Sequence, residues 1–382
     1  MPIERERMQK IASQYDNKNV TIGIFGSHSA KPLGMSTKEM GVKNVIIVEE
    51  GRDELYTVHN RHLYDRIIKL RKFRDILHKE IQDELRELNT IFVPNRSFVE
   101  YVGRYGIEND FEVPFYGSRA LFSKCEDRNY EKGQYYLLEK AGIRFPKQFE
   151  SPKEIDKLAL IKVQRADNPK ERCFFFANSF EDYLKEAEEY KKQGLISDEG
   201  LEKARIEEYV LGPRFNANFH RYFLTDVYGE LDYVGTADRI QVNLQGFLNL
   251  PAREQLKIHE LITNEEVGHQ AGRTIRESKE PLFWDAAKKL VKVTDEEFPP
   301  GIRGPFGIQG SVAYSSLDKK TLEFVVYDLS LRTPGDLAIG PTSPEMRNLS
   351  LKHGINIKDP MDLVVMEIQK AAKDNRLKDI VT

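Results

Sequence analysis

Short apolar runs alternate with polar, helix-forming stretches over the first 125 residues. The apolar runs are rich in β-branched side chains, which favours strands. They are VTIGIFG (20–26), NVIIVEE (44–50), DRIIKL (65–70) and TIFVP (90–94). Between the last two runs, residues 73–88 carry apolar side chains at helical spacing. Because strands that alternate with helices are typical of an open parallel sheet, the pattern predicts an α/β domain over residues 1–125.

A different order of elements follows in residues 126–212. After a helical segment comes the apolar run LALIKVQ (158–164), whose predicted hairpin partner is RCFFFANS (172–179). An amphipathic helix then begins with Ser179 as its N-cap, and a strand lies within 204–212. Strand, strand, helix, strand is a compact α+β unit. We therefore predict a second domain over residues 126–212.

The remaining residues, 213–382, predict a third domain in which strands and helices are mixed. The polar and apolar pattern places its elements in the following ranges: strands up to about 250, helix at about 253–280, helix at 283–291, strands at 304–315 and 322–332, and a helix at 359–374.

Composition narrows the class of protein. Hydrophobic residues make up 40% of the chain, which is enough for a packed core. The 58 basic and 61 acidic residues nearly cancel, whereas a protein that coats nucleic acid usually has a large positive excess. No stretch approaches the roughly 20 apolar residues that span a bilayer. Two cysteines favour a reducing compartment. We expect a cytoplasmic protein with no nucleic-acid or membrane partner.

Two polar segments follow predicted strands of the first domain. The run GIFGSHSA (23–30) has neither the spacing of a dinucleotide fingerprint nor a Walker A lysine, but a glycine turn before a helix presents N–H donors to anions. The run VPNRSF (93–98) also lies at the carboxyl end of a strand, the edge where open α/β sheets bind ligands. We expect the polar side chains of 27–29 and 95–97 to meet around one ligand. A plain turn with a capping serine and an ordinary polar loop are the structural alternatives.

Lys162 and the segment RIEEYVLG (205–212) are candidates for nucleotide binding. Lys162 lies in an apolar strand, so its ammonium needs a partner, which is either a phosphate or a surface carboxylate. In a nucleotide pocket, the backbone of a segment such as 205–212 pairs with adenine, and a carboxylate accepts from ribose hydroxyls. An edge strand with exposed glutamates explains the same residues without a ligand.

Gln309 and Asp328 lie on apolar runs that we expect to pair as a hairpin. A carboxylate inside such a run is costly unless it is paired or bound to a metal. Mg²⁺ prefers oxygen ligands and usually bridges carboxylates to phosphates. The alternative is an ion pair between Asp328 and Arg332, which share a face of the strand.

Together these segments resemble the archaeal formate-dependent purine biosynthesis synthetase family. The resemblance covers nearly the whole chain, and its segments fall in the family's order. They are GSHSA (26–30), IFVPNRSFVEYVG (91–103), YYLLEKAGIRFPK (135–147), IEEYVLG (206–212) and VNLQGFLNLPA (242–252). The resemblance implies an ATP-grasp fold with a Rossmann-like N-terminal domain, a lid at 126–212 and a C-terminal catalytic part. It also implies a homo-oligomer.

The activity that the resemblance implies is ligation of formate to 5-aminoimidazole-4-carboxamide ribonucleotide at the expense of ATP, by way of formyl phosphate. The residues that would contact the ribonucleotide are His28, Ser97 and Asn243. The residues that would hold ATP are Lys162, Glu207, Glu208, Tyr209 and Val210. The residues that would hold Mg²⁺, with Mn²⁺ as the alternative ion, are Gln309 and Asp328.

This chain departs from the family pattern at several places, of which two concern the proposed metal and phosphate sites. The first metal position is usually glutamate, whereas Gln309 brings an amide oxygen without negative charge. The loop QRADNPKER (164–172) lacks the glycines that usually fold over phosphates. Two other functions therefore remain open: a paralogue that binds nucleotides without turnover, and an ATP-grasp ligase for another carboxylate and amine.

Overall fold

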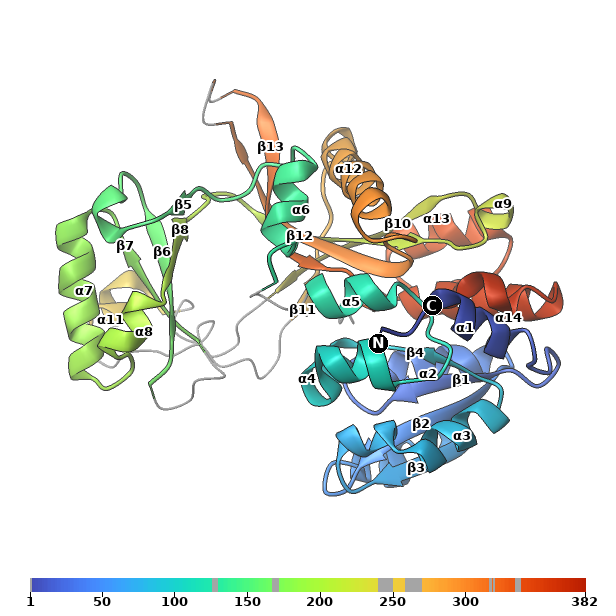
Figure 1. Ribbon diagram of the computed structural model, residues 1–382. Helices are drawn as coiled ribbons and strands as arrows, with labels where there is room; N and C mark the ends of the chain where they lie inside the picture. Colours follow the sequence, from blue (N-terminus) through green and yellow to red (C-terminus); the bar gives the residue numbers. More distant parts are fainter. Residues whose placement is uncertain are drawn as a thin grey trace.

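Three sheets organise the chain in the computed structural model (Figure 1). It describes residues 2–125, 130–166, 172–239, 250–257, 270–315, 318, 320–333 and 338–382. The small antiparallel sheet and its helix α7 extend away from the other two sheets, which lie next to each other. Among the described residues, no helix combines the length and the apolar character needed to cross a bilayer.

The N-terminal sheet is fully parallel, with strand order β3-β2-β1-β4. This confirms the predicted open α/β sheet. Its strands are β1 (Thr21–Phe25), β2 (Lys43–Glu49), β3 (Arg66–Leu70) and β4 (Thr90–Val93). The helices of this part are α1 (Arg5–Ala12), α2 (Ala30–Glu39), α3 (Lys79–Glu87), α4 (Arg96–Tyr105) and α5 (Arg119–Cys125).

The single helix predicted over residues 73–88 is wrong. A 3₁₀ turn, Phe73–Leu77, is separated from α3 by His78, whose backbone is extended. The Asp75 carboxylate accepts a hydrogen bond from the Lys72 N–H (2.9 Å), so the short turn carries its own cap. The break lets Phe73 pack against Phe25, with ring centroids 4.2 Å apart. Tertiary packing therefore overrides the helical spacing.

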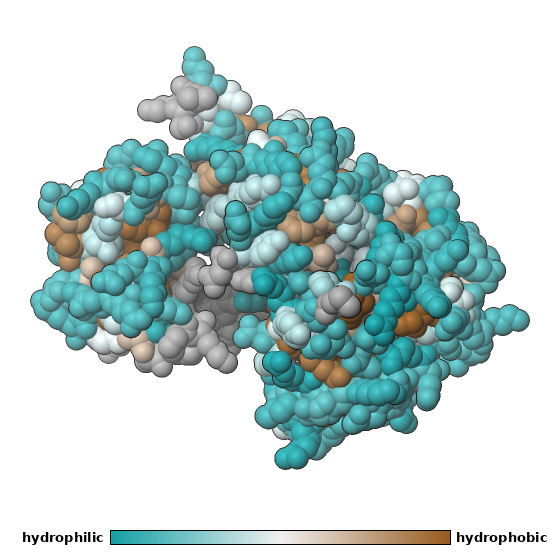
Figure 2. Space-filling model, in the orientation of Figure 1, coloured by the Kyte–Doolittle hydropathy of each residue, from teal (hydrophilic) through white to brown (hydrophobic). Residues whose placement is uncertain are grey.

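The small antiparallel sheet, here called the lid, has strand order β5-β8-β6-β7. Its elements are β5 (Gln148–Phe149), β6 (Ala159–Gln164), β7 (Arg172–Ala177), α7 (Phe180–Lys192), α8 (Asp198–Glu202) and β8 (Arg205–Glu208). Ser179 Oγ accepts a hydrogen bond from the Asp182 N–H (3.2 Å), which confirms the predicted N-cap of α7. Figure 2 shows a mostly hydrophilic surface, with hydrophobic patches on the lid over α7 and the strands beside it.

The large antiparallel sheet has strand order β11-β10-β9-β12-β13. Its strands are β9 (Arg214–Arg221), β10 (Leu231–Arg239), β11 (Gln270–Gly272), β12 (Gly304–Tyr314) and β13 (Leu322–Ser330). The helices of this part are α6 (Gln134–Lys140), α9 (Thr225–Tyr228), α11 (Ala252–Gln255), α12 (Pro281–Glu297), α13 (Pro344–His353) and α14 (Pro360–Lys373).

The continuous helix predicted at 253–280 is wrong in its described part. Helix α11 ends at Gln255, and β11 pairs antiparallel with β10 at Ala237–Gly272 and its neighbours. Pairing to an existing sheet edge satisfies the backbone of β11 without a helix. Residues 258–269 lie outside the described part of the chain.

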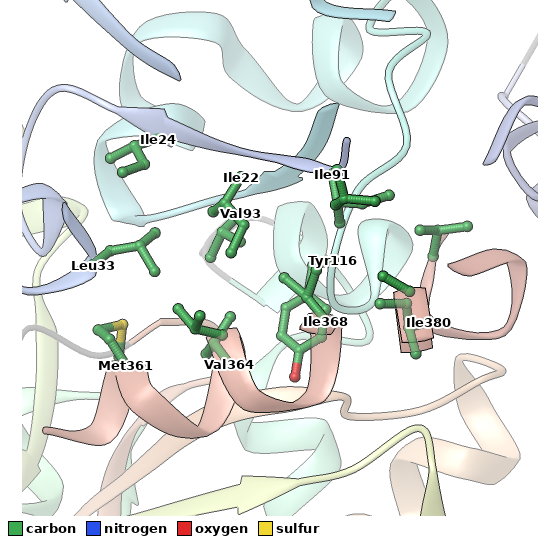
Figure 3. Close-up of a cluster of buried hydrophobic side chains, with 14 of the residues drawn as sticks. Ile22, Ile24, Leu33, Ile91, Val93, Tyr116, Met361, Val364, Ile368 and Ile380 are labelled. Carbon is green, nitrogen blue, oxygen red and sulfur yellow. The ribbon is translucent and has the colours of Figure 1, made fainter. Parts of the chain in front are cut away.

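Two helices pack against a different predicted domain from the one that contains them in the sequence. Helix α6 falls within the predicted range 126–212, yet Leu137 and Leu138 share a core with α12 and the large sheet. Helix α14 belongs to the range 213–382, yet Met361, Val364 and Ile368 pack on Ile22, Ile24, Ile91 and Val93 of the parallel sheet (Figure 3). The domain limits at 125 and 212 therefore remain predictions.

Shortening an α14 side chain that faces the parallel sheet should destabilise the fold. Ile368 is fully buried, so Ile368→Ala should lower the free energy of unfolding in urea by about 2–5 kcal/mol, since it leaves a cavity. Leu351 on α13 is 78% exposed, and Leu351→Ala should change it by less than about 0.5 kcal/mol. Equal effects of the two substitutions would contradict the packing of α14.

Candidate functional site

The two polar segments of the parallel sheet meet at the carboxyl ends of β1 and β4. Asn95 Nδ2 donates hydrogen bonds to the carbonyl oxygens of Phe25 (3.0 Å) and Ser27 (2.8 Å). Ser97 Oγ donates to Ser27 Oγ (2.8 Å). The segment 95–97 is not an open loop, because Asn95 is the N-cap residue of α4 and Ser97 lies in its first turn. The predicted neighbourhood of 27–29 and 95–97 is therefore present.

His28 lies at the exposed tip of this neighbourhood. Its φ of 44° is in the left-handed region, which is uncommon for a residue with a side chain, although histidine adopts it more readily than most. Ser29 occupies the N-cap position of α2 but makes no side-chain cap hydrogen bond. The alternative in which Ser29 serves only as a helix cap is therefore not supported. In the same loop region, Asn95 Oδ1 is buried and has no hydrogen-bond partner among the described residues.

Lys162 and Glu207 form an ion pair on the face of the lid sheet opposite its core. The alternate residues Ala159, Ile161 and Val163 of β6 belong to the core, which turns Lys162 to the other face. The Glu207 side chain is only 3% exposed and also accepts from Tyr135 Oη (3.0 Å) and Gln148 Nε2 (3.4 Å). Its oxygens are thus engaged within the protein. Burial, reinforced by the Glu207 charge, raises the pKa of Tyr135, which keeps the phenol protonated as a donor.

The other residues of the predicted ATP-binding segment lie where the lid joins the large sheet. Glu208 is turned toward Arg144 (3.6 Å) and accepts from the Lys147 N–H (3.2 Å). Tyr209 is 37% exposed and its ring meets that of Phe176 edge to face at 5.1 Å. In the described part of the chain, the N–H and carbonyl of Val210 take part in no hydrogen bond. The backbone groups of Val210 are therefore not engaged by any described residue.

Gln309 and Asp328 are directly opposite each other on β12 and β13. This confirms the predicted hairpin. Gln309 Nε2 donates to Ser330 Oγ (3.4 Å), which leaves the Oε1 end of the amide for a ligand. Asn216 of β9 faces Gln309 from the other side. These oxygens suit Mg²⁺, which keeps few protein ligands when it is bound through phosphates. Among the described residues, no group of three His, Cys, Asp or Glu side chains forms a metal cluster.

A chain of contacts through α6 joins the lid to β13. Gln134 Oε1 accepts a hydrogen bond from the Leu329 N–H (3.1 Å), and Gln134 Nε2 donates one to the Tyr327 carbonyl (3.4 Å). The Gln134 amide therefore bonds the backbone on both sides of Asp328. The next residue, Tyr135, donates to Glu207, the partner of Lys162. The metal candidates and the lysine candidate are therefore linked by two consecutive side chains.

A second link joins the end of β13 to the parallel sheet. Thr333 forms an isolated parallel bridge with Asn95, the residue that holds the Ser27 loop. Asn95, Lys162 and Asp328 come from three distant parts of the sequence, and hydrogen-bonded neighbours connect all three. Asn243, predicted to contact the ribonucleotide, lies outside the described residues.

Sequence analysis gave no role to Gln134, Tyr135, Asn216 or Ser330. For Asn216 a signal was present, because polar and apolar residues alternate over residues 214–220 (RFNANFH). In the structure, Phe215, Ala217 and Phe219 face the core, so the intervening polar residues form a polar sheet face. For Gln134 and Tyr135 the sequence held no such signal, because their hydrogen-bond partners are far away in sequence.

Two family models match the chain. One, described as a protein of unknown function (DUF1246), covers residues 22–149, and the other, a domain of unknown function (DUF1297), covers residues 182–382. Together they span the parallel sheet and the large sheet with part of the lid. Neither description names an activity.

Curated relatives carry a more specific name, 5-formaminoimidazole-4-carboxamide-1-(beta)-D-ribofuranosyl 5'-monophosphate synthetase. The protein of Methanocaldococcus jannaschii is 35% identical over 333 residues, which is 87% of this chain and 88% of the relative. The protein of Methanopyrus kandleri is 34% identical over the same shares. The protein of Methanothermobacter thermautotrophicus is 31% identical over 383 residues, which is 100% of this chain and 99% of the relative.

Solved structures agree on the fold. The IMP biosynthesis protein PurP from Thermococcus kodakaraensis superposes with a TM-score of 0.65 at 19% identity, covering 94% of this chain and 100% of the other. An ADP complex of N5-carboxyaminoimidazole ribonucleotide synthetase superposes with a TM-score of 0.54 at 13% identity, covering 90% and 78%. The fold is thus the ATP-grasp fold, and the chain belongs to the family of 5-formaminoimidazole-4-carboxamide-1-(beta)-D-ribofuranosyl 5'-monophosphate synthetases.

Proposed function

We propose that the protein is a formate- and ATP-dependent ligase that converts 5-aminoimidazole-4-carboxamide ribonucleotide to its 5-formamido product in IMP biosynthesis. The observation that carries the proposal is the unbroken set of contacts from Asn95 through β13 and α6 to Lys162. A ligase of this kind must hold two phosphorylated molecules and a small acid close together. The names of the relatives support the same reaction.

The parallel sheet supplies the ribonucleotide site in this proposal. Its 5'-phosphate fits the start of α2, where a helix N-terminus and the hydroxyl of Ser27 present donors to an anion, while Ser97 donates to Ser27 Oγ and so orients that hydroxyl. His28, exposed at the tip of the loop, is placed to reach the ribonucleotide. Asn95 acts as a positioning residue, because its amide fixes the Ser27 loop from beneath. Asn243 completes the proposed set.

The lid and its junction supply the ATP site. Val210 offers backbone groups for adenine, and the exposed rings of Tyr209 and Phe176 offer an apolar wall for the base. Lys162 is placed to meet an ATP phosphate, while Glu207 holds its ammonium in position. Glu207 and Glu208 are both tied to protein partners, so we assign them to shaping the site.

Gln309 and Asp328 would hold Mg²⁺, or Mn²⁺, at the phosphates. The ion supplies neutralisation of the charge on the transferred phosphoryl group. Asp328 brings the one negative charge of this pair, and Ser330 orients the Gln309 amide. The protein needs no covalent chemistry of its own, because positioning and electrostatic stabilisation account for most of phosphoryl-transfer catalysis.

The proposed reaction has two steps. A formate oxygen attacks the γ-phosphorus of ATP, and the bond to the bridging oxygen breaks, which gives formyl phosphate and ADP. The 5-amino nitrogen of the ribonucleotide then attacks the formyl carbon, loses a proton and expels inorganic phosphate. The chain's own work is to hold the three reactants in line and to keep water out. Small-molecule substrates, a cytoplasmic location and a homo-oligomeric state belong to the same proposal.

Gln309 favours one competing function, a paralogue that binds nucleotides without turnover. With an amide in place of a carboxylate, the metal pair carries one negative charge instead of two. Such a protein would bind ATP and release no ADP with any acid. A ligase for another carboxylate and amine would release ADP, but only with those substrates.

Turnover should depend on formate and on Asp328. We expect ADP and the formamido product only when ATP, formate and the ribonucleotide are all present, as measured by chromatography of the reaction. Asp328→Asn should lower the rate by roughly 100-fold or more, because it removes the charged metal ligand. Glu323→Gln, on the same strand but bonded to Arg144, is the matched control and should retain activity. An active wild type with an unimpaired Asp328→Asn variant would refute the metal assignment.

Removing the Lys162 ammonium should weaken nucleotide binding specifically. Lys162→Met should raise the dissociation constant for a non-hydrolysable ATP analogue by roughly tenfold or more, since a charge-assisted contact to phosphate is lost. Lys185→Met, on the exposed face of α7, should leave it unchanged. Isothermal titration calorimetry measures both. If both variants bind like the wild type, ATP is held elsewhere.

A further inference from the structure

A large groove lies at the end of the molecule opposite the candidate site. It has a volume of about 810 Å³ and is lined by the segments that precede β1 and β2 together with the last turns of α14. Val20 immediately precedes β1, whose far end leads into the Ser27 loop, and Lys43 begins the parallel neighbour β2. Five residues of strand separate the two ends, which is roughly 16 Å. The groove is thus a separate site.

Four lysines surround the groove from two walls. Lys18 and Lys43 come from the parallel sheet, and Lys370 and Lys373 come from one turn of α14. Lys370 pairs with Asp374, and Lys43 Nζ bonds Asn19 Oδ1 (3.0 Å). For Lys18 and Lys373 no ion pair forms within the described part of the chain. No described residue lining the groove is acidic, although Asp16, outside the lining, interacts with the charges of Lys18 and Lys43. The lining itself is therefore positive in a chain with a net charge of -3.

The floor of the groove is apolar. Met40, Val42 and the ring of Tyr228 are half-buried and line it, and the side chain of Ile355 is 39% exposed. Amide groups, such as that of Asn356 on the rim, offer hydrogen bonds in several directions. An apolar floor with a few polar groups, in a volume between about 300 and 1,000 Å³, is typical of sites for small ligands.

We propose that this groove binds a small organic phosphate of nucleotide size. The lysines of the two walls neutralise a phosphate carrying about two negative charges. The apolar floor and Tyr228 cover a planar or apolar body, as a base or similar ring would provide. A free phosphate would use only the lysines and leave the floor exposed to water. The chemistry of the groove therefore favours a ligand that carries both a phosphate and a planar or apolar body.

Position-resolved lysine acylation tests the site in the full-length protein. Mass spectrometry follows the acylation rate of each lysine with AMP, with IMP or with inorganic phosphate present. We expect AMP or IMP to slow acylation of Lys18, Lys43, Lys370 and Lys373 by roughly tenfold at ten times its dissociation constant. Inorganic phosphate at the same concentration should protect much less. No protection by either nucleotide overturns the proposal, and equal protection by inorganic phosphate overturns the organic ligand.

Variants separate this groove from the catalytic site. In Lys18→Glu/Lys373→Glu, nucleotide should no longer protect Lys43 and Lys370. The control Lys10→Glu/Lys292→Glu makes the same change of net charge at exposed lysines outside the groove and should keep full protection. In Lys162→Met, groove protection should persist although ATP binding at the lid weakens. Loss of groove protection in Lys162→Met, or its persistence in the groove variant, would place the ligand elsewhere.

Discussion

The burial of α14 between two sheets is the constraint on which the rest of the structure depends. One side of the helix packs apolar residues on the parallel sheet (Figure 3). On another side, Glu367 is fully buried and accepts hydrogen bonds from Tyr116 Oη (2.6 Å) and the Leu224 N–H (2.7 Å). Burial, and then the Glu367 charge, holds the pKa of Tyr116 well above its usual value, so the phenol remains a donor. A buried carboxylate tolerates no loss of such partners, so the two sheets are held in one relative position.

With the sheets fixed, a few polar contacts bring the candidate site together. Asn95 forms a backbone bridge with Thr333, which follows β13, and its side-chain amide donates a hydrogen bond to the carbonyl of Ser27, which follows β1. Gln134 clasps the backbone beside Asp328, while the adjacent Tyr135 reaches into the lid. Because the side-chain contacts come from residues on a helix or at a helix start, the groups are placed before a ligand arrives. Such preorganisation is what a ligase that acts mainly by positioning requires.

The sequence was informative wherever local pattern decides the structure. The four parallel strands, the Ser179 cap and the pairing of Gln309 with Asp328 all follow from spacing and residue type. It failed where distant partners decide. The break at His78 accompanies the packing of Phe73 against Phe25, and β11 depends on the open edge of β10. Likewise, no local signal could reveal that Gln134 and Tyr135 bridge two parts of the site, because each partner lies at least 72 residues away.

In the proposed metal pair, Gln309 departs from the glutamate of the family pattern but still offers an oxygen to the ion. Its amide nitrogen is tied to Ser330, so the oxygen is the end that remains for a cation. A glutamate at this position would stand directly opposite Asp328 on the neighbouring strand, and two carboxylates that close raise each other's pKa unless a cation lies between them. The glutamine removes that repulsion, so the pair is stable without metal. Because the amide carries no charge, the electrostatic attraction of the proposed site for Mg²⁺ must come mainly from Asp328 and the phosphates of ATP. Metal and nucleotide should therefore bind to this chain together rather than one after the other.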